Sequence, residues 1–147
     1  MTAQASWRFF NLGAATDADS LVPSGPGVTP SGGIATVRGD DAIRQAIVML
    51  LATRPGERVM RPTYGCPLDR LLFNANDATT AGLAIHYVSQ ALRRWEPRID
   101  IVRLDAGPAP DSLAGPSVLQ IRLDYRVRSS QRRDNIIVAV DLMTEAA

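Results

Sequence analysis

The sequence predicts an α+β domain in which two main helices pack on a small, mainly antiparallel sheet, preceded by an extended N-terminal arm. Two segments with helical spacing of apolar residues, 40–54 and 79–96, precede three segments with strand character between residues 99 and 142. The 147 residues suit one ordinary domain, and a hydrophobic content of 46% is enough to form a buried core. We therefore divide the chain into an arm, residues 1–39, and a domain, residues 40–147.

Each helix is predicted from apolar residues that recur on one face. In the first helix Asp40 is available as the N-cap, and Pro55-Gly56 follows the last turn. The second helix runs from about Thr79 to Trp95, and Pro97 stops it. The apolar faces consist of Ile43, Ile47, Leu50 and Leu51 in the first helix and of Ala84, Val88, Ala91, Leu92 and Trp95 in the second.

The segment between the helices contains a short alternating stretch. Residues 57–61 alternate polar and apolar side chains, which predicts a short strand beside the sheet. Pro62, Gly65 and Pro67 then predict turns, and the apolar residues of 68–73 predict a helical turn.

Three strands are predicted after the second helix. Residues 118–128 alternate strictly, which indicates one buried face. The strand Ile99–Leu104 changes its apolar phase between Ile101 and Val102, so we expect a β-bulge there. Residues 107–117 form a loop rich in Pro and Gly.

The last strand, Asn135 to Leu142, is apolar on both faces. Ile136, Val138 and Val140 share one face, and Ile137 and Ala139 share the other. A strand of this kind needs neighbours, so it takes either a central place in its own sheet or pairs with another subunit.

The arm shows no periodicity of a core element. It begins with an aromatic cluster, Trp7-Arg8-Phe9-Phe10, and continues in Gly, Pro, Ser, Thr and Ala to Gly33. The aromatic residues predict that the arm packs on a surface, and the outside of its own domain is one candidate.

Composition disfavours several classes of function. A net charge of +1 favours neither nucleic-acid binding nor a membrane surface, and no segment approaches the roughly 18 apolar residues of a membrane span. The single cysteine, Cys66, cannot form an internal disulfide, and a reducing compartment is the simplest expectation. We expect a soluble protein that is assembled in the cytoplasm.

Catalytic chemistry finds little support. Glu57 and Glu96 are the candidates for a glycosidase pair, but each lies beside an arginine, and an ion-paired carboxylate is a poor general acid. His86 has no acidic partner at helical spacing, Cys66 has no adjacent base, and no glycine-rich phosphate loop is present. We therefore predict no enzyme, no metal and no cofactor, with a cell-wall hydrolase as the alternative.

Two linked blocks carry a resemblance to a known family. The segment 50–68, LLATRPGERVMRPTYGCPL, followed by Leu71-Leu72-Phe73, resembles the phage baseplate wedge and sheath-initiator family, which is often labelled lysozyme-like. The segment 91–99, ALRRWEPRI, contains the Glu-Pro-Arg signature of that family at the matching distance, and the resemblance covers about residues 32–142. Members occur in contractile phages, type VI secretion systems and extracellular injection particles.

The resemblance implies a structural subunit in six-fold rings around an inner tube. Its implied partners are the sheath protein, baseplate wedge proteins and tube-initiator or hub proteins, with six copies per particle, no nucleic acid and no membrane insertion. The subunit would join the wedge to the first sheath ring and template sheath polymerisation by strand pairing. Assembly in the cytoplasm into a phage tail-like particle is expected, with release from the cell left open. A generic adaptor without sheath contact is a further alternative.

Three segments supply the candidate partner-binding residues. Arg54, Glu57 and Arg58 lie in a reversal where Pro55 fixes one dihedral and Gly56 allows a positive φ. At the end of the second helix, the charges of Glu96-Pro97-Arg98 either point outward to a partner or form an internal pair that ties the helix end. The third segment is the last strand, with Asn135, Ile136, Ile137, Val138, Ala139 and Val140.

Overall fold

The computed structural model describes residues 5–7, 29–34, 36–110 and 117–143. Its helices are α1 (Asp40–Ala52), the short 3-10 helix η2 (Leu68–Leu71) and α2 (Ala78–Trp95). Its strands are β1 (Ala5–Trp7), β2 (Thr36–Arg38), β3 (Ile99–Pro108), β4 (Val118–Val127) and β5 (Arg133–Asp141). The predicted α+β class, with two main helices and an antiparallel sheet, is confirmed.

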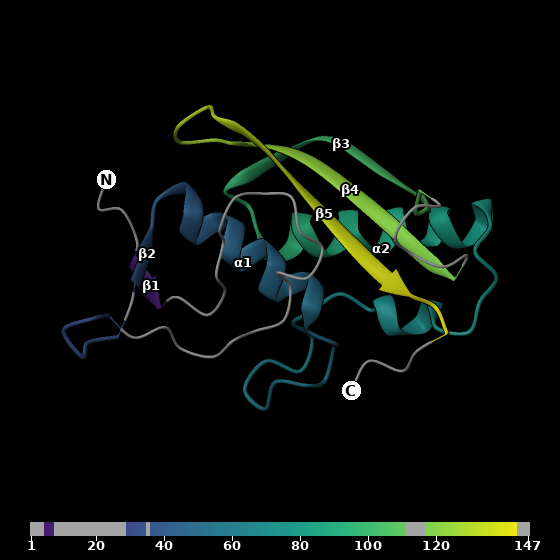
Figure 1. The fold of residues 1–147 in the computed structure, drawn as a ribbon, viewed down its shortest axis with the longest axis horizontal. Helices are drawn as coiled ribbons and strands as arrows, with labels where there is room; N and C mark the ends of the chain where they lie inside the picture. Colours follow the sequence, from purple (N-terminus) through teal and green to yellow (C-terminus); the bar gives the residue numbers. More distant parts are fainter. Residues whose placement is uncertain (1–4, 8–28, 35, 111–116, 144–147) are drawn as a thin grey trace.

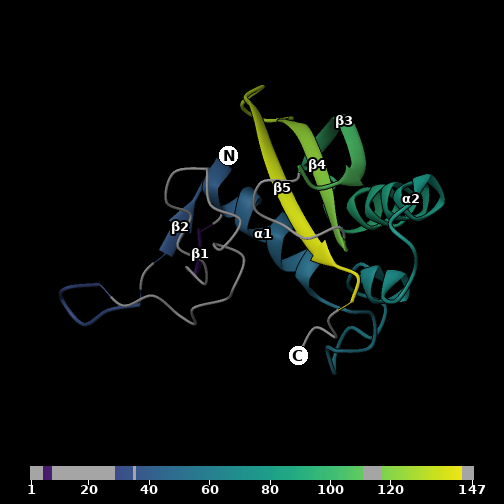
Figure 2. The same cartoon turned by 45° about the vertical axis from the view of Figure 1, so that its right-hand side comes forward.

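The main sheet has the order β3-β4-β5, with both pairs antiparallel. Both α1 and α2 lie against one face of it (Figures 1 and 2). The alternation of β4 explains this layering, because the residues of one face are buried and those between them are more exposed. The buried face of β4 consists of Leu119, Ile121, Leu123, Tyr125 and Val127.

One apolar core joins the helices to the sheet. It includes Ile47 and Leu50 from α1, Leu71 from η2 and Val88 and Leu92 from α2, all almost completely buried. The predicted apolar faces of both helices therefore point into this core. The N-cap of α2 is Asp77, whose Oδ1 accepts a hydrogen bond from the Thr80 backbone N–H at 2.9 Å. That hydrogen bond lowers the pKa of Asp77.

The predicted N-cap of α1 is wrong. Gly39, at φ 62°, is the N-cap residue, and Asp40 is the first residue of the helix. The Asp40 carboxylate accepts hydrogen bonds from the Ser130 hydroxyl at 3.1 Å instead. A glycine readily adopts the positive φ of the residue that precedes this helix. Because Gly39 takes the N-cap position, the Asp40 carboxylate is available for a tertiary contact.

The predicted strand at residues 57–61 is also wrong. This segment forms turns whose hydrogen bonds stay inside the loop, including Gly56 N–H to Pro62 O at 2.7 Å and Arg61 N–H to Arg58 O at 3.2 Å. Gly56 has φ 89°, the positive value that a glycine after Pro55 allows. The loop closes on itself, so its backbone is not available to the sheet.

The predicted bulge in β3 is confirmed. Ile101 pairs with Tyr125 and Arg103 with Asp124, so Val102 is the extra residue. The strand continues to Pro108, further than the expected end at Leu104.

The alternative that gave the last strand a central place in its own sheet is wrong. Among the described residues, β5 lies at the edge of the sheet and pairs with β4 alone. Its inner face is covered, because Ile136 is buried and Val138 and Val140 are partly buried, whereas Ile137 and Ala139 are exposed.

Part of the predicted arm has regular structure. β1 pairs with β2 in a separate antiparallel ribbon, and the Val37 side chain of β2 is buried. This short ribbon of extended strands is not part of the buried apolar cluster, which agrees with an extended arm that lacks a core element. Phe9, Phe10 and most of the arm, like residues 111–116 of the predicted loop, lie outside the described residues. No described helix is long and apolar enough to cross a membrane.

Candidate functional site

The Glu-Pro-Arg corner forms an internal ion pair. The chain leaves α2 at Trp95, and the Glu96 backbone N–H still donates to Leu92 O at 2.9 Å. Arg98 donates from Nε to Glu96 Oε1 at 2.6 Å and from Nη2 to Oε2 at 2.8 Å. Glu96 is buried, so the expectation that it points outward is wrong, whereas Arg98 stays partly exposed. The hydrogen bonds from Arg98 to Glu96 raise the pKa of Arg98, although burial opposes this.

A hollow of about 410 Å³ lies beside this corner. Its second carboxylate, Asp100, accepts from Arg128 Nε at 2.8 Å and from Arg126 Nη2 at 3.4 Å. The hydrogen bond from Arg128 holds the pKa of Asp100 below its usual value. The lining residues are Leu92, Arg93, Glu96, Pro97, Ile99, Asp100, Ile101 and Arg128.

The loop after α1 holds the other predicted charged residues. Glu57 Oε2 accepts from the Arg54 backbone N–H at 2.8 Å, so this carboxylate closes the turn that Pro55-Gly56 begins. Arg58 lies over the Tyr64 ring, with its guanidinium carbon 4.5 Å from the ring centre. Both groups thus have intramolecular contacts that hold them in place.

The two sequence blocks meet through a pair of aromatic residues. The rings of Tyr64 and Trp95 contact edge to face at 5.3 Å between centres, and Trp95 immediately precedes Glu96. Burial raises the pKa of Tyr64, and the Glu96 charge adds to that rise. The sequence analysis missed this contact. The only sequence signal was one aromatic residue in each block, which does not specify that they touch.

The stem of the loop approaches α1 very closely. The Cys66 backbone N–H donates to Thr53 O at 2.9 Å, and Gly65 has φ 130°. A Cβ at Gly65 would lie 2.5 Å from Thr53 O. Cys66 is buried, and burial raises the pKa of its thiol to about 12. This environment suits packing and opposes thiolate chemistry.

The carboxylates that could be considered for a glycosidase pair are bound within the protein. Glu96 and Asp100 are each bound by arginines, and Glu57 is bound by its own loop. His86 is exposed on α2 beside Tyr87. Among the residues that the structure describes, no three His, Cys, Asp or Glu side chains gather in a way that could hold a metal ion.

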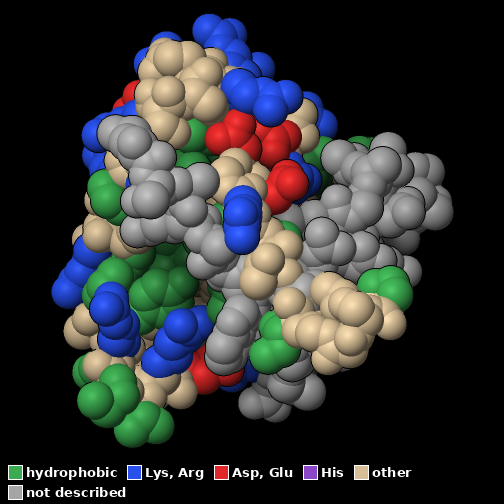
Figure 3. Space-filling model, turned by 90° about the vertical axis from the view of Figure 1, so that its left-hand side faces the viewer, with side chains coloured by type: hydrophobic (Ala, Val, Ile, Leu, Met, Phe, Trp, Pro, Cys, Tyr) green, Lys and Arg blue, Asp and Glu red, His purple; other side chains and the backbone are tan. Residues whose placement is uncertain are grey.

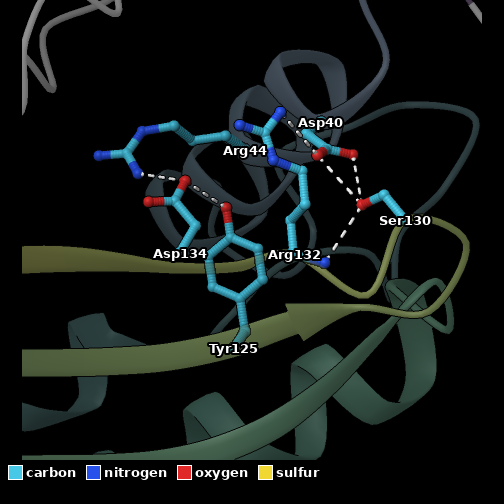
Figure 4. Close-up of polar contacts among 6 residues, drawn as sticks. All are labelled: Asp40, Arg44, Tyr125, Ser130, Arg132 and Asp134. Atoms are coloured by element: carbon cyan, nitrogen blue, oxygen red, sulfur yellow. Dashed lines mark hydrogen bonds and ion pairs between the residues drawn. The ribbon is translucent and has the colours of Figure 1, made fainter.

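The β4–β5 hairpin is fastened to the first turns of α1 (Figure 4). Arg44 Nη1 donates to Asp134 Oδ2 and to the Asn135 carbonyl oxygen, both at 2.7 Å. The buried Tyr125 hydroxyl donates to the same Asp134 oxygen at 3.0 Å. The start of β5 is thereby fixed against α1, and the Asn135 carbonyl already has an intramolecular donor.

The two edge strands of the sheet, β3 and β5, differ in how well each could pair with a strand from another protein. β3 carries the bulge at Val102, an ion pair between Arg103 and Asp105 at 3.2 Å, and Pro108. Bulges, charges and proline are features that block strand addition at an edge. β5 pairs with β4 in unbroken register, and its residues 135–140 carry no charge. The hydrogen-bonding geometry therefore favours β5 as the edge that can accept a strand.

Comparison with known proteins agrees with this architecture. The sequence pattern of the family described as baseplate wedge protein gp25 matches residues 37–132, which is more than half of the chain. The baseplate wedge protein gp25 of Enterobacteria phage T4 is 31% identical over 70 residues, or 48% of this chain, and the matched region spans 53% of that relative's length.

Two solved structures are similar to most of this chain. The crystal structure of a protein named as a tail lysozyme from Geobacter sulfurreducens is 37% identical, with a TM-score of 0.63, and the match covers 74% of this chain and 94% of that one. A chain of the anti-feeding prophage baseplate is 21% identical, with a TM-score of 0.60, and the match covers 97% of this chain and 89% of that one. The second likeness shows the fold alone. The family match and the residues of both blocks together show that this chain belongs to the baseplate wedge protein gp25 family.

Proposed function

We propose that this protein is a structural baseplate subunit that joins the wedge to the sheath of a contractile injection system. Sheath polymerisation begins when a strand of the sheath protein pairs with β5. The observation that carries this proposal is that, among the described residues, β5 is an edge strand in unbroken register with β4, and its residues 135–140 carry no charge. The family to which the chain belongs is one of baseplate wedge proteins, which supports the site of assembly.

Strand addition suits a template that must hold during contraction. Each main-chain hydrogen bond contributes about 0.5–1.5 kcal/mol net, so one strand gives moderate affinity and a ring of strands gives high avidity. Six copies per particle would supply that ring. The tether between Arg44 and Asp134 fixes β5 before the sheath arrives, which lowers the entropy lost on pairing.

The remaining candidate residues serve the wedge side of the subunit in this proposal. The buried Glu96–Arg98 pair holds the end of α2, and the partly exposed Arg98 faces wedge, hub or tube-initiator proteins. Arg54, Glu57 and Arg58 present the neighbouring loop to the same proteins. The subunit assembles in the cytoplasm into a phage tail-like particle, and its role is not enzymatic.

The test places charge on the β5 edge. Ile137→Lys with Ala139→Lys changes two exposed side chains, so the purified variant is expected to keep its circular dichroism spectrum and melting temperature. Electron microscopy of the particles is expected to show complete baseplates with tubes that lack sheath, because charged edge residues oppose strand addition. Leu83→Lys on α2 is the matched control, since Leu83 is 38% exposed and Ile137 is 39% exposed. Sheathed, contractile particles with the β5 variant would contradict the proposal.

A cell-wall hydrolase remains a second candidate because one relative is named as a tail lysozyme. The hydrogen bond from Arg128 opposes it, because it holds the pKa of Asp100 below its usual value and a general acid must hold a proton. Dye release from labelled peptidoglycan by the purified protein decides the matter. Release that disappears in Glu96→Gln and Asp100→Asn would favour the hydrolase.

A further inference from the structure

The loop after α1 has a β-turn at its tip, and the two corner positions of this turn carry large apolar side chains. The Arg61 backbone N–H donates to Arg58 O at 3.2 Å, which places Val59 and Met60 at the two corner positions. Gly, Pro, Asn, Asp and Ser are the usual residues of such turns. Val59 is 95% exposed and Met60 is 91% exposed, so neither contributes to the protein's own core.

The turn stands on a rigid base. Gly56 N–H to Pro62 O at 2.7 Å and Tyr64 N–H to Arg61 O at 3.1 Å close the loop, and Glu57 accepts from the Arg54 backbone. At the stem, Gly65 lies against Thr53 O so closely that a side chain has no room. A preorganised loop loses little conformational entropy when it docks.

Arginines adjoin this apolar tip in the sequence. Residues 54–61 contain three arginines and one glutamate, and the glutamate is bound to the Arg54 backbone. In Figure 1 the loop between α1 and η2 hangs at the lower edge of the molecule, and in Figure 3 that edge carries apolar side chains near arginines. Met and Arg are both enriched in the cores of protein interfaces.

We infer that Val59 and Met60 form an apolar plug that inserts into an apolar pocket rimmed by carboxylates on another baseplate protein. The charge pattern selects this occupant, because Arg58 and Arg61 flank the plug and would meet acidic residues at the rim. The hollow beside the Glu96 corner of a second copy does not match, since Arg93 and Arg128 line it and its two carboxylates are paired. The identity of the partner as a baseplate protein rests on the proposed function. The assignment of Val59 and Met60 as a plug rests on the structure of the loop alone.

The first experiment removes the plug. Val59→Ser with Met60→Ser leaves the loop's backbone hydrogen bonds in place, so the purified variant is expected to unfold at the wild-type temperature. In particles, the amount of this subunit in purified baseplates is expected to fall at least tenfold. Ile34→Ser with Val102→Ser, two other exposed apolar side chains, is the matched control and is expected to leave the amount unchanged.

The second experiment identifies the pocket. A benzoylphenylalanine photo-crosslinker at position 60 in assembled particles is expected to label another baseplate protein in a segment where apolar residues adjoin Asp or Glu. Arg61→Glu is expected to abolish that adduct, and reversing the labelled acidic residue to Arg is expected to restore it. Adducts confined to this chain, or wild-type amounts of the Val59→Ser, Met60→Ser variant in baseplates, would overturn the inference.

An anionic membrane is the competing occupant. Flotation of the purified protein with phosphatidylglycerol vesicles is expected to show no binding, and binding that the double Ser variant loses would overturn the inference in favour of lipid. Failure of the proposed function gives different results. The wild-type chain would then be missing from baseplates, or particles with the β5 Lys variant would carry normal sheath.

Discussion

Gly65 is, among the glycines that the structure describes, the one least tolerant of a side chain. Its backbone has φ 130°, a conformation that L residues rarely adopt. It also lies so close to the Thr53 backbone that an added Cβ would be 2.5 Å from Thr53 O. The same contact is fixed by the hydrogen bond from Cys66 to Thr53. The position of the whole loop relative to α1 therefore depends on this glycine.

Gly65→Ala is expected to lower the free energy of unfolding by about 2 kcal/mol or more, through backbone strain and displacement of the loop stem. Urea unfolding followed by circular dichroism measures this change. Gly82→Ala in α2 is the matched control, because a Cβ there meets nothing within 4 Å. In a helix that substitution is expected to stabilise by about 0.5–1 kcal/mol. Equal effects at the two positions would contradict the steric argument.

Local chemistry could be predicted at single residues, and long-range contacts could not. Gly56 was expected to allow a positive φ after Pro55, and the structure has one. Asp40 also looked like a cap, but Gly39 takes that position and Asp40 binds Ser130, 90 residues away in the sequence. The burial of Glu96 against Arg98 depends on the direction in which the chain turns from α2 into β3. Neither residue type determines that direction.

At the scale of elements, the β4–β5 hairpin depends on a buried polar contact with α1. Tyr125 is almost completely buried, and its hydroxyl donates to the Asp134 oxygen that Arg44 also contacts. Burial raises the pKa of Tyr125, and the Asp134 charge adds to that rise, so the phenol stays protonated as a donor. The contact joins the first turns of α1 to the edge strand that we propose receives the sheath.

A double-mutant cycle tests this contact. Tyr125→Phe is expected to cost about 1 kcal/mol, and Asp134→Ala about 1–2 kcal/mol because it leaves the buried hydroxyl without its acceptor. The double variant is expected to cost less than the two losses together, by at least about 0.5 kcal/mol. Urea unfolding of the four proteins gives the coupling. Strictly additive losses would mean that the hydroxyl and the carboxylate do not act together.

The elements with long periodic patterns were the ones the sequence could predict. α2 and β4 repeat their apolar spacing over 18 and 10 residues, and both were located nearly to the residue. The alternation of residues 57–61 covers too few positions to distinguish a strand from a turn. The edge position of β5 depends on strand order, which a pattern of apolar residues does not contain.

At the scale of the whole molecule, the core that the structure describes is built from α1 onward. Every residue of the buried apolar cluster lies between Ile43 and Leu142. β1 and β2 form a ribbon apart from the main sheet, and Val37 is the buried apolar residue of β2. The division at residue 39 stays a prediction, and this arrangement leads us to expect that the domain folds without most of the arm.

A chain of residues 36–147 is therefore expected to unfold in one cooperative transition. Its loss of stability relative to the full chain is expected to stay within about 3 kcal/mol, the value of exposing one Val side chain. Urea unfolding followed by circular dichroism measures both quantities. Leu50→Ala, which removes a fully buried side chain, is expected to cost about 2–5 kcal/mol equally in the long and short chains, because distant sites are additive. A short chain that unfolds without cooperativity, or an unequal cost of Leu50→Ala, would show that the arm belongs to the core.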